Sequence, residues 1–179
     1  MKNCSLLLLS ALLALLIDVA PLYAGDALPK GLRVYTPGPA PAFRLADMDG
    51  ESFSLSEARG HWVFVHFWAS WCGPCRKEMP AVQRMAELLQ DEQLLIVMIN
   101  TSEDEDTIFS FLGSYAPDMS SLMDSDGQVT EAWQPRGLPA TYLVDPRGNI
   151  RYQALGGRPW DQEEYLGFLR TLSRQPGTE

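Results

Sequence analysis

The chain has 179 residues, of which 46% are hydrophobic and 21% are charged, and its formal net charge at neutral pH is −9. These values are ordinary for one soluble globular domain, and they exclude a chain that is largely disordered. An acidic protein of this kind is not attracted to a polyanion, so we expect no nucleic acid among its partners.

Residues 1–24 have the pattern of a secretory signal. Lys2 precedes an apolar run from Leu6 to Ile17, and the small residue Ala24 ends the segment. The run is shorter than the roughly 20 apolar residues that span a bilayer, which favours a cleaved signal over an uncleaved membrane anchor, the alternative that stays open. We therefore expect a periplasmic protein, from which Cys4 is removed with the signal.

Segment 25–42 is rich in proline and is expected to be an extended lead-in without a helix. The folded domain is predicted to span 43–172, with 173–179 as a tail. Residues 43–46 and 52–55 flank the turn pair Asp49-Gly50 and predict a short hairpin.

The centre of the chain predicts a βαβ unit. Ser56 is the expected cap of one helical turn that ends at Gly60, and the run from His61 to Trp68 predicts a strand buried on both faces. A second apolar strand is expected at 94–99. The two strands are predicted to be parallel, because a helix joins them, and its apolar residues are Val82, Met85, Ala86 and Leu89.

The last third predicts two helices and a hairpin. Ser102 and Glu105 form a capping box, and the acidic run Glu103 to Asp106 is interpreted as a helix start in preference to a metal or partner site. Strands at 141–144 and 150–153 flank a proline and glycine turn. Asp161 is the expected cap of the final helix, whose apolar residues are Tyr165, Phe168, Leu169 and Leu172.

Cys72 and Cys75 are the two cysteines that remain after the signal. A disulfide that closes so short a loop restricts the unfolded chain very little, so the pair is better explained by chemistry than by stability. Cys72 precedes a predicted helix, whose free N–H groups and dipole favour a thiolate, the attacking species in disulfide exchange. Cys75 follows one turn later on the same side of the helix, where it can resolve a mixed disulfide.

A zinc site is the competing interpretation of two closely spaced cysteines. It requires two further ligands, and only His61 and His66 are available after the signal. These histidines are five residues apart on one predicted strand, so they point to opposite faces. We therefore predict no metal.

The run from Phe67 to Cys75, with Pro80 and the later Gly137 to Thr141, resembles the thioredoxin superfamily, and most closely the exported reductases of the TlpA/ResA type. The resemblance extends over about residues 40 to 172. It implies an α/β thioredoxin-like fold, in which helices flank a central mixed sheet, with an N-terminal β-hairpin and a βα insertion. It also implies that the protein works without a cofactor beyond its redox-active cysteine pair.

The resemblance further assigns roles to residues around the pair. Cys72 is the attacking thiol, Cys75 is the resolving thiol, and Pro139 is a cis-proline beside them. A cis-proline there would turn the backbone of Leu138 outward, where an extended substrate segment can pair with it. The residues implied in substrate binding are Trp71, Gly73, Pro74 and Leu138.

Two further residues have competing interpretations. His66 stands where cytoplasmic thioredoxins usually carry a buried aspartate, so it is either a core histidine bonded to backbone or a proton relay for Cys75. Glu78 matches a carboxylate that some TlpA/ResA-type reductases place near the cysteines. The alternative for Glu78 is a surface acid that the helix dipole favours.

The resemblance implies an enzyme that reduces disulfides of exported proteins, acts as a monomer and receives electrons from a membrane thiol reductant. Cytochrome c maturation is a fitting setting, because apocytochrome cysteines need reduction. An oxidant or isomerase with the same cysteine pair is the alternative. A peroxiredoxin-like peroxidase is disfavoured because Ala69 stands where its threonine is needed, and a non-catalytic module is disfavoured because both cysteines are kept.

Overall fold

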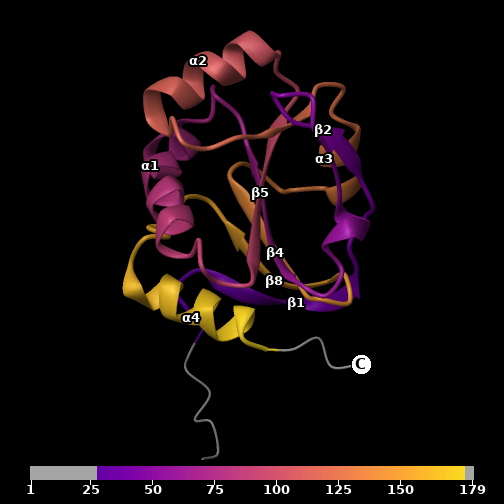
Figure 1. Ribbon diagram of the computed structural model, residues 1–179, viewed down its shortest axis with the longest axis vertical. Coiled ribbons are helices and arrows are strands. Elements are labelled where there is room, and N and C mark those ends of the chain that lie inside the picture. Colours follow the sequence, from indigo (N-terminus) through magenta and orange to yellow (C-terminus); the bar gives the residue numbers. More distant parts are fainter. Residues whose placement is uncertain (1–27, 176–179) are drawn as a thin grey trace, which may run out of the picture.

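The computed structural model describes residues 28–175, which form an α/β fold with a six-stranded mixed sheet between helices (Figure 1). The predicted signal, 1–24, and the end of the predicted tail lie outside the described residues. In chain order the elements are β1 (Leu32–Pro39), β2 (Arg44–Ala46), β3 (Ser52–Ser54), η1 (Leu55–Ala58), β4 (Trp62–Trp68), α1 (Gly73–Leu88), β5 (Leu94–Thr101), α2 (Glu105–Tyr115), β6 (Leu122–Asp124), α3 (Gln128–Trp133), β7 (Ala140–Val144), β8 (Asn149–Leu155) and α4 (Glu163–Ser173).

The strand order in the sheet is β1-β8-β7-β4-β5-β6. β4 runs parallel to β5, which confirms the predicted βαβ unit. β7 pairs antiparallel with β4 on one side and with β8 on the other, and the second pairing confirms the predicted hairpin. The hairpin of β2 and β3 forms a separate two-stranded sheet. β6 and α3, between α2 and β7, correspond to the βα insertion that the resemblance implies.

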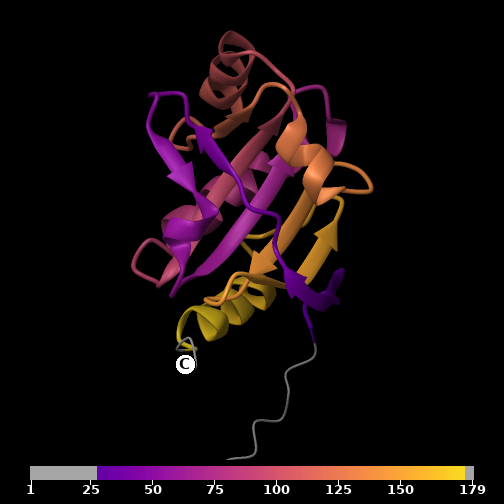
Figure 2. The ribbon, with the colours of Figure 1, turned by 90° about the vertical axis from the view of Figure 1, so that its right-hand side faces the viewer.

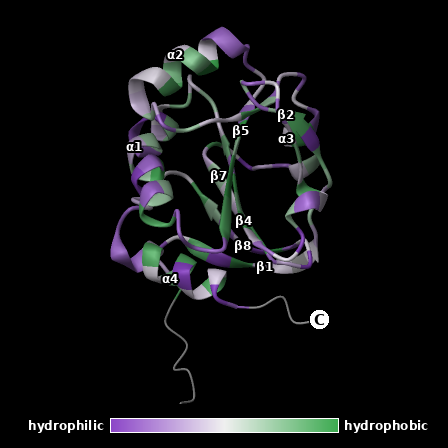
Figure 3. Cartoon of the chain, viewed as in Figure 1, coloured by the Kyte–Doolittle hydropathy of each residue, from purple (hydrophilic) through white to green (hydrophobic). Residues whose placement is uncertain are grey.

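β4 separates two apolar cores, because successive side chains of a strand point to opposite faces. All seven of its residues are buried, and the central strands are among the most apolar parts of the chain (Figure 3). Trp62, Phe64 and Trp68 pack with α1, α2 and α4, and the residues between them pack with α3 and the β2–β3 hairpin (Figures 1 and 2). His66 shares the alternation of the first set and so faces α1.

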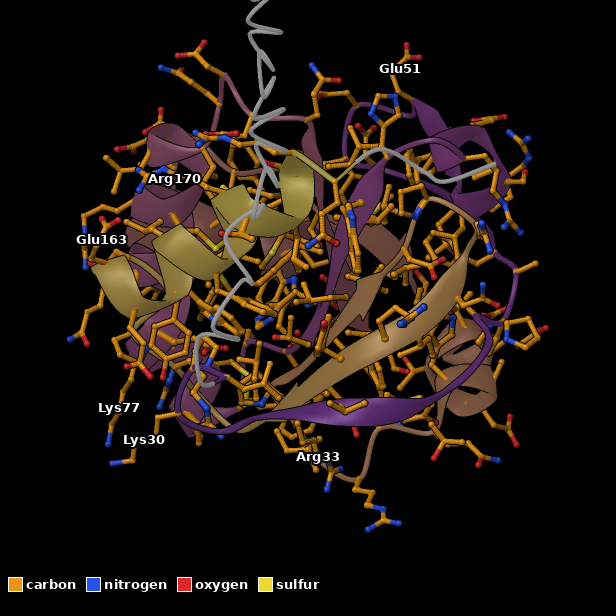
Figure 4. The ribbon with its side chains drawn as sticks, turned by 90° about the horizontal axis from the view of Figure 1, so that it is seen from below. Lys30, Arg33, Glu51, Lys77, Glu163 and Arg170 are labelled. Carbon is orange, nitrogen blue, oxygen red and sulfur yellow. A yellow bond between two sulfur atoms is a disulfide. The ribbon has the colours of Figure 1, made fainter. Side chains whose placement is uncertain are left out.

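The proline-rich segment is extended, as predicted, but it is part of the sheet. β1 pairs antiparallel with β8, with Leu32 opposite Ala154, so the sheet begins well before Phe43 (Figure 4). Proline is tolerated here because β1 is an edge strand, and the register is irregular between Val34 and Gly38. The alternation of apolar residues is too short in this segment to predict a strand.

Three predicted helix caps are wrong by one or two residues. Ser54 rather than Ser56 precedes η1, and its N–H donates to Glu57. Asp104 caps α2 by accepting from the Thr107 N–H, because Ser102 has φ 58° and cannot take the extended conformation of a cap. Gln162 precedes α4, while the expected cap, Asp161, pairs with Arg84 at 2.8 Å.

Glu92 joins the end of α4 to the turn after α1. Ser173 donates to its carboxylate at 2.8 Å and Arg174 at 3.1 Å. These two hydrogen bonds, of which that from Ser173 is the stronger influence, hold the pKa of Glu92 below its ordinary value. A lowered pKa in the folded state means that the ionised carboxylate stabilises the fold above its unfolded pKa, and that this stabilisation is lost as pH falls through the folded pKa.

We therefore expect Glu92→Gln to lower the free energy of unfolding at pH 7, and the difference from the wild type to shrink steadily as the pH falls below about 4. Urea unfolding at a series of pH values measures this. Asp91→Asn, at the exposed neighbour in the same turn, is the control and should show a much smaller difference at pH 7. Equal losses in the two variants would refute the assignment.

Within residues 28–175, every helix is too short or too polar to cross a bilayer.

Candidate active site

Cys72 and Cys75 form a disulfide at the amino end of α1, with their Cα atoms 5.2 Å apart. Cys72 is the N-cap of the helix, and its Sγ accepts the Cys75 N–H at 3.2 Å. Pro74 lies in the first turn, where its missing N–H leaves no gap in the helix. The same backbone donor and the helix dipole would stabilise a thiolate on Cys72 once the disulfide is reduced.

The two cysteines differ in solvent exposure. Cys72 is 5% exposed and Cys75 is fully buried, whereas the adjacent Trp71 is 67% exposed. A partner sulfur approaching from solvent therefore meets Cys72 first. This asymmetry agrees with the roles that the resemblance assigns to the two cysteines, and it places Trp71 on the rim of the site.

His66 and Glu78 form a buried pair behind the disulfide-bearing helix turn. His66 Nε2 and Glu78 Oε1 are 3.1 Å apart, and both residues are at most 5% exposed. The two atoms are close without a well-aligned hydrogen bond, and neither has another partner. His66 Nδ1 lies 2.8 Å from Thr141 Oγ1, on the neighbouring strand β7.

These contacts bear on the two interpretations of Glu78 and on the two interpretations of His66. Glu78 is not a surface acid, since α1 turns it into the core. His66 is a core histidine, but its partners are side chains rather than backbone. An imidazole and a carboxylate in contact can share one proton, which avoids the cost of an unpaired buried charge.

The loop after β8 completes the surroundings of the pair. The Arg158 N–H donates to Glu78 Oε2 at 2.7 Å, and the Gly156 N–H donates to Pro139 O at 2.8 Å. Gly157 lies close to α1, because a Cβ added there would lie 3.4 Å from both Glu78 Oε2 and Pro74 O. This loop therefore holds α1 and the proline loop together.

The Leu138–Pro139 peptide is cis, as the resemblance implies. Pro139 is buried and Leu138 partly buried, and Leu138 packs against the core cluster that contains both cysteines. Gly137 is exposed. The segment expected to receive substrate backbone is thus accessible at its first residues.

The acidic run contains an unexpected contact. Glu103 is not part of the start of α2: Asp104 caps that helix, and Glu103 accepts hydrogen bonds from the N–H and the hydroxyl of Ser70. The distance from the Ser70 N to Glu103 Oε2 is 2.7 Å, and Asn100 Nδ2 is also 2.7 Å from that oxygen. Glu103 therefore contacts the turn that leads to Cys72.

A shallow groove of about 500 Å³ begins beside this turn. One side is formed by Ser70 and Arg76, which flank the cysteine pair, and the other side is the exposed face of α2. Its remaining lining residues are Asp106, Thr107, Ser110, Phe111, Ser114 and Tyr115. Among residues 28–175, no cluster of three or more His, Cys, Asp or Glu side chains could hold a metal ion.

Sequence reasoning missed four contributors to the site, namely Thr141, Arg158, Ser70 and Glu103. Thr141 ends the run from Gly137 to Thr141 that carries part of the resemblance. Its place opposite His66 follows once the order of the strands in the sheet is known. Arg158 acts through its backbone N–H, which carries no sequence signal. Ser70 and Glu103 are 33 residues apart, so local patterns do not connect them.

A mixed sheet with a disulfide at the start of the helix after its central strand, and a cis-proline beyond it, defines a thioredoxin-fold protein with a redox-type cysteine pair. The sequence model of the AhpC/TSA family matches residues 38–153. The chain belongs to this thioredoxin-like family.

Its relatives narrow the class further. The chain is 34% identical over 111 residues to the thiol-disulfide oxidoreductase ResA of Bacillus subtilis, a match that covers 62% of this chain and only 62% of that relative. It is 33% identical over 129 residues to the ResA of Halalkalibacterium halodurans, covering 72% of this chain and 73% of the relative. These names confirm the expected resemblance to ResA-type oxidoreductases.

Solved structures agree on the fold. A putative thiol:disulfide interchange protein DsbE from Chlorobium tepidum superposes with a TM-score of 0.66 at 29% identity, covering 76% of this chain and 99% of that structure. The thioredoxin domain of a thiol-disulfide oxidoreductase from Bacteroides vulgatus gives 0.67 at 26% identity, covering 79% of this chain and all of that one. The predicted fold class is therefore confirmed.

Proposed function

We propose that this protein is a periplasmic protein-disulfide reductase that works by dithiol–disulfide exchange through Cys72 and Cys75. The observation that supports this most directly is the cysteine pair itself, in which Cys72 is slightly exposed and caps the helix while Cys75 is fully buried. Gly73 and Pro74 between the cysteines match reducing thioredoxins better than the oxidising enzymes, as the sequence resemblance indicates.

The exchange proceeds in two balanced steps. The Cys72 thiolate attacks one sulfur of a partner disulfide, that S–S bond breaks, and the released partner thiolate takes a proton. Cys75 then loses its proton and attacks the Cys72 sulfur of the mixed disulfide. The second partner thiol leaves, two electrons have passed to the partner, and the Cys72–Cys75 disulfide remains to be reduced by a membrane thiol reductant.

The His66 and Glu78 pair is the proposed acceptor of the Cys75 proton. Cys75 is fully buried, so water has little access to it, and its proton must pass to a group inside the protein. Glu78 lies three residues after Cys75 in α1, with its Oε1 3.1 Å from His66 Nε2, and both side chains are groups that can accept a proton. Thr141 and the Arg158 N–H fix the two side chains from either end, so the pair keeps its geometry while the proton moves.

The partners we propose are exported proteins with disulfides, and apocytochromes c awaiting haem attachment are the favoured group. The segment at Gly137 and Leu138 would offer backbone pairing, and the exposed Trp71, next to Cys72 in the chain, would offer an apolar contact. A polypeptide that carries a cysteine can therefore be held by contacts other than its sulfur.

The reduction potential of the cysteine pair tests this proposal. The full chain is expressed, recovered from a periplasmic extract and equilibrated with thiol buffers, while Trp fluorescence reports its redox state. We expect an intact mass that begins at Gly25 and a potential below about −220 mV, near that of thioredoxin. A potential above about −150 mV would overturn the reductase proposal in favour of an oxidant or isomerase, and retention in the cytoplasm would overturn the proposed location.

A further inference from the structure

Glu103 contacts Ser70, in the turn between β4 and α1, through its side chain. Its carboxylate accepts both of the donors of Ser70, the N–H at 2.7 Å and the hydroxyl, and its Oε2 also accepts from Asn100 Nδ2 at 2.7 Å. Hydrogen bonds to an ionised carboxylate are about twice as strong as those between neutral groups. The contact is therefore a strong link between two distant segments.

The backbone before Glu103 is shaped to aim this side chain. Ser102 has φ 58°, in the left-handed region that residues other than glycine rarely adopt. Its N–H donates to Asp124 O at 3.0 Å, which fixes the reversed backbone against β6. Asn100, which donates to Glu103, is fully buried near the end of β5. Unusual backbone conformations of this kind concentrate at functional sites.

The two ends of the turn that Glu103 contacts are fixed by other means. Ala69 and Cys72 are buried in the core, Cys72 is bonded to Cys75, and the Cys72 N–H donates to Ala69 O at 3.2 Å. Trp71 is 67% exposed, so packing does little to fix its ring. Ser70 is therefore the residue through which a contact from outside the turn can set the orientation of Trp71.

We propose that Glu103 is a positioning residue for disulfide exchange. By holding Ser70, Glu103 fixes the orientation of the Trp71 side chain. A partner polypeptide then finds Trp71 already placed for contact when its sulfur reaches Cys72. The inference rests on the proposed function and deepens it: Glu103 serves substrates that are polypeptides, which contact Trp71, and matters less for a small disulfide, which needs only the sulfur of Cys72.

The test compares Glu103→Gln with Glu105→Gln, which removes the same charge from an exposed side chain of the same acidic run. For each variant, kcat/KM is measured with a disulfide-bonded peptide and with a small aromatic disulfide. Glu103→Gln should lower kcat/KM for the peptide about tenfold, mainly through KM, and should lower the ratio of the peptide value to the small-disulfide value. Ser70→Ala, which removes only the hydroxyl bond, should give a smaller drop in the same ratio.

Amide hydrogen exchange of residues 70–72 gives a second readout that needs no activity. Glu103→Gln should speed exchange at these positions, and Glu105→Gln should leave it unchanged. Equal kinetics in the two Gln variants, or equal losses for peptide and small disulfide, would overturn the proposal. If exchange accelerates as expected but the wild type reduces neither disulfide, the positioning of the turn stands and the proposed function fails.

Discussion

Replacing Cys75 with serine is expected to stop the reaction at the mixed disulfide, and replacing Cys72 with serine is expected to prevent its formation. The first expectation follows because Cys75 is the proposed resolving thiol, so without it a partner sulfur bound to Cys72 has no internal attacker left. The second follows because a hydroxyl is a far weaker nucleophile than a thiolate. We expect either variant to lose at least about 10³-fold in turnover.

The measurement is a single-turnover reaction of the reduced protein with a disulfide-bonded peptide, followed by acid quenching and intact mass. Cys75→Ser should accumulate a covalent adduct of protein and peptide, and Cys72→Ser should accumulate none. The two variants control for each other, since each keeps one thiol of the pair. An adduct in Cys72→Ser but not in Cys75→Ser would reverse the assigned roles.

Removing the carboxylate of Glu78 is expected to give the largest loss of stability among single changes at the site. Glu78→Ala leaves His66 Nε2 without its neighbouring carboxylate and the Arg158 N–H without an acceptor. Breaking one member of a buried pair costs about 3–5 kcal/mol. Glu78→Gln keeps an acceptor for the Arg158 N–H and should cost clearly less.

Urea unfolding of the oxidised protein measures these losses. Glu87→Ala, at an exposed position of the same helix, is the matched control and should change the unfolding free energy by less than about 0.5 kcal/mol. A double-mutant cycle with His66→Ala should give a coupling of roughly 0.5–3 kcal/mol, as expected for residues in contact. A coupling near zero would contradict the contact between Nε2 and Oε1.

Glutamine variants at the same two positions test proton transfer. If the pair accepts the Cys75 proton, Glu78→Gln should slow the resolution step, seen as a longer-lived mixed disulfide, and the pH dependence of that step should change. Glu87→Gln should leave both unchanged. An unaltered lifetime and pH profile in Glu78→Gln would limit the pair to a structural role.

The strands and helices nearest the site were predictable because their sequence patterns are strong. The buried run of β4 and the helical spacing in α1 each depend on neighbours within a few residues, and the cysteine motif lies between them. Trp68, which was expected in the core, is fully buried, and its ring N–H donates to Ser121. Met85, one of the apolar residues that predicted the helix, is also fully buried.

What sequence patterns did not predict depends on contacts between distant residues. β1 is a strand only because β8 lies beside it, and its prolines obscure any alternation. Asp104 and Ser102 are both good caps by composition, and the left-handed backbone at Ser102 decides between them. The contacts of Glu103 with Ser70 and Asn100 cannot be predicted from local patterns, because they depend on how β5 is placed beside β4.

Arg158 has a consequence for the order in which the molecule is assembled. Its guanidinium contacts the carbonyls of Gly31, Leu155 and Gly157, and its N–H contacts Glu78. Arg158 thus joins the start, the middle and the last quarter of the described chain. β1 likewise becomes part of the sheet only by pairing with β8, near the end of the chain. During synthesis both thiols emerge long before Arg158, so a nascent chain carries the reactive dithiol while its surroundings are still open. A chain truncated before Arg158 lacks the backbone donor to Glu78, so the surroundings of its cysteine pair stay incomplete.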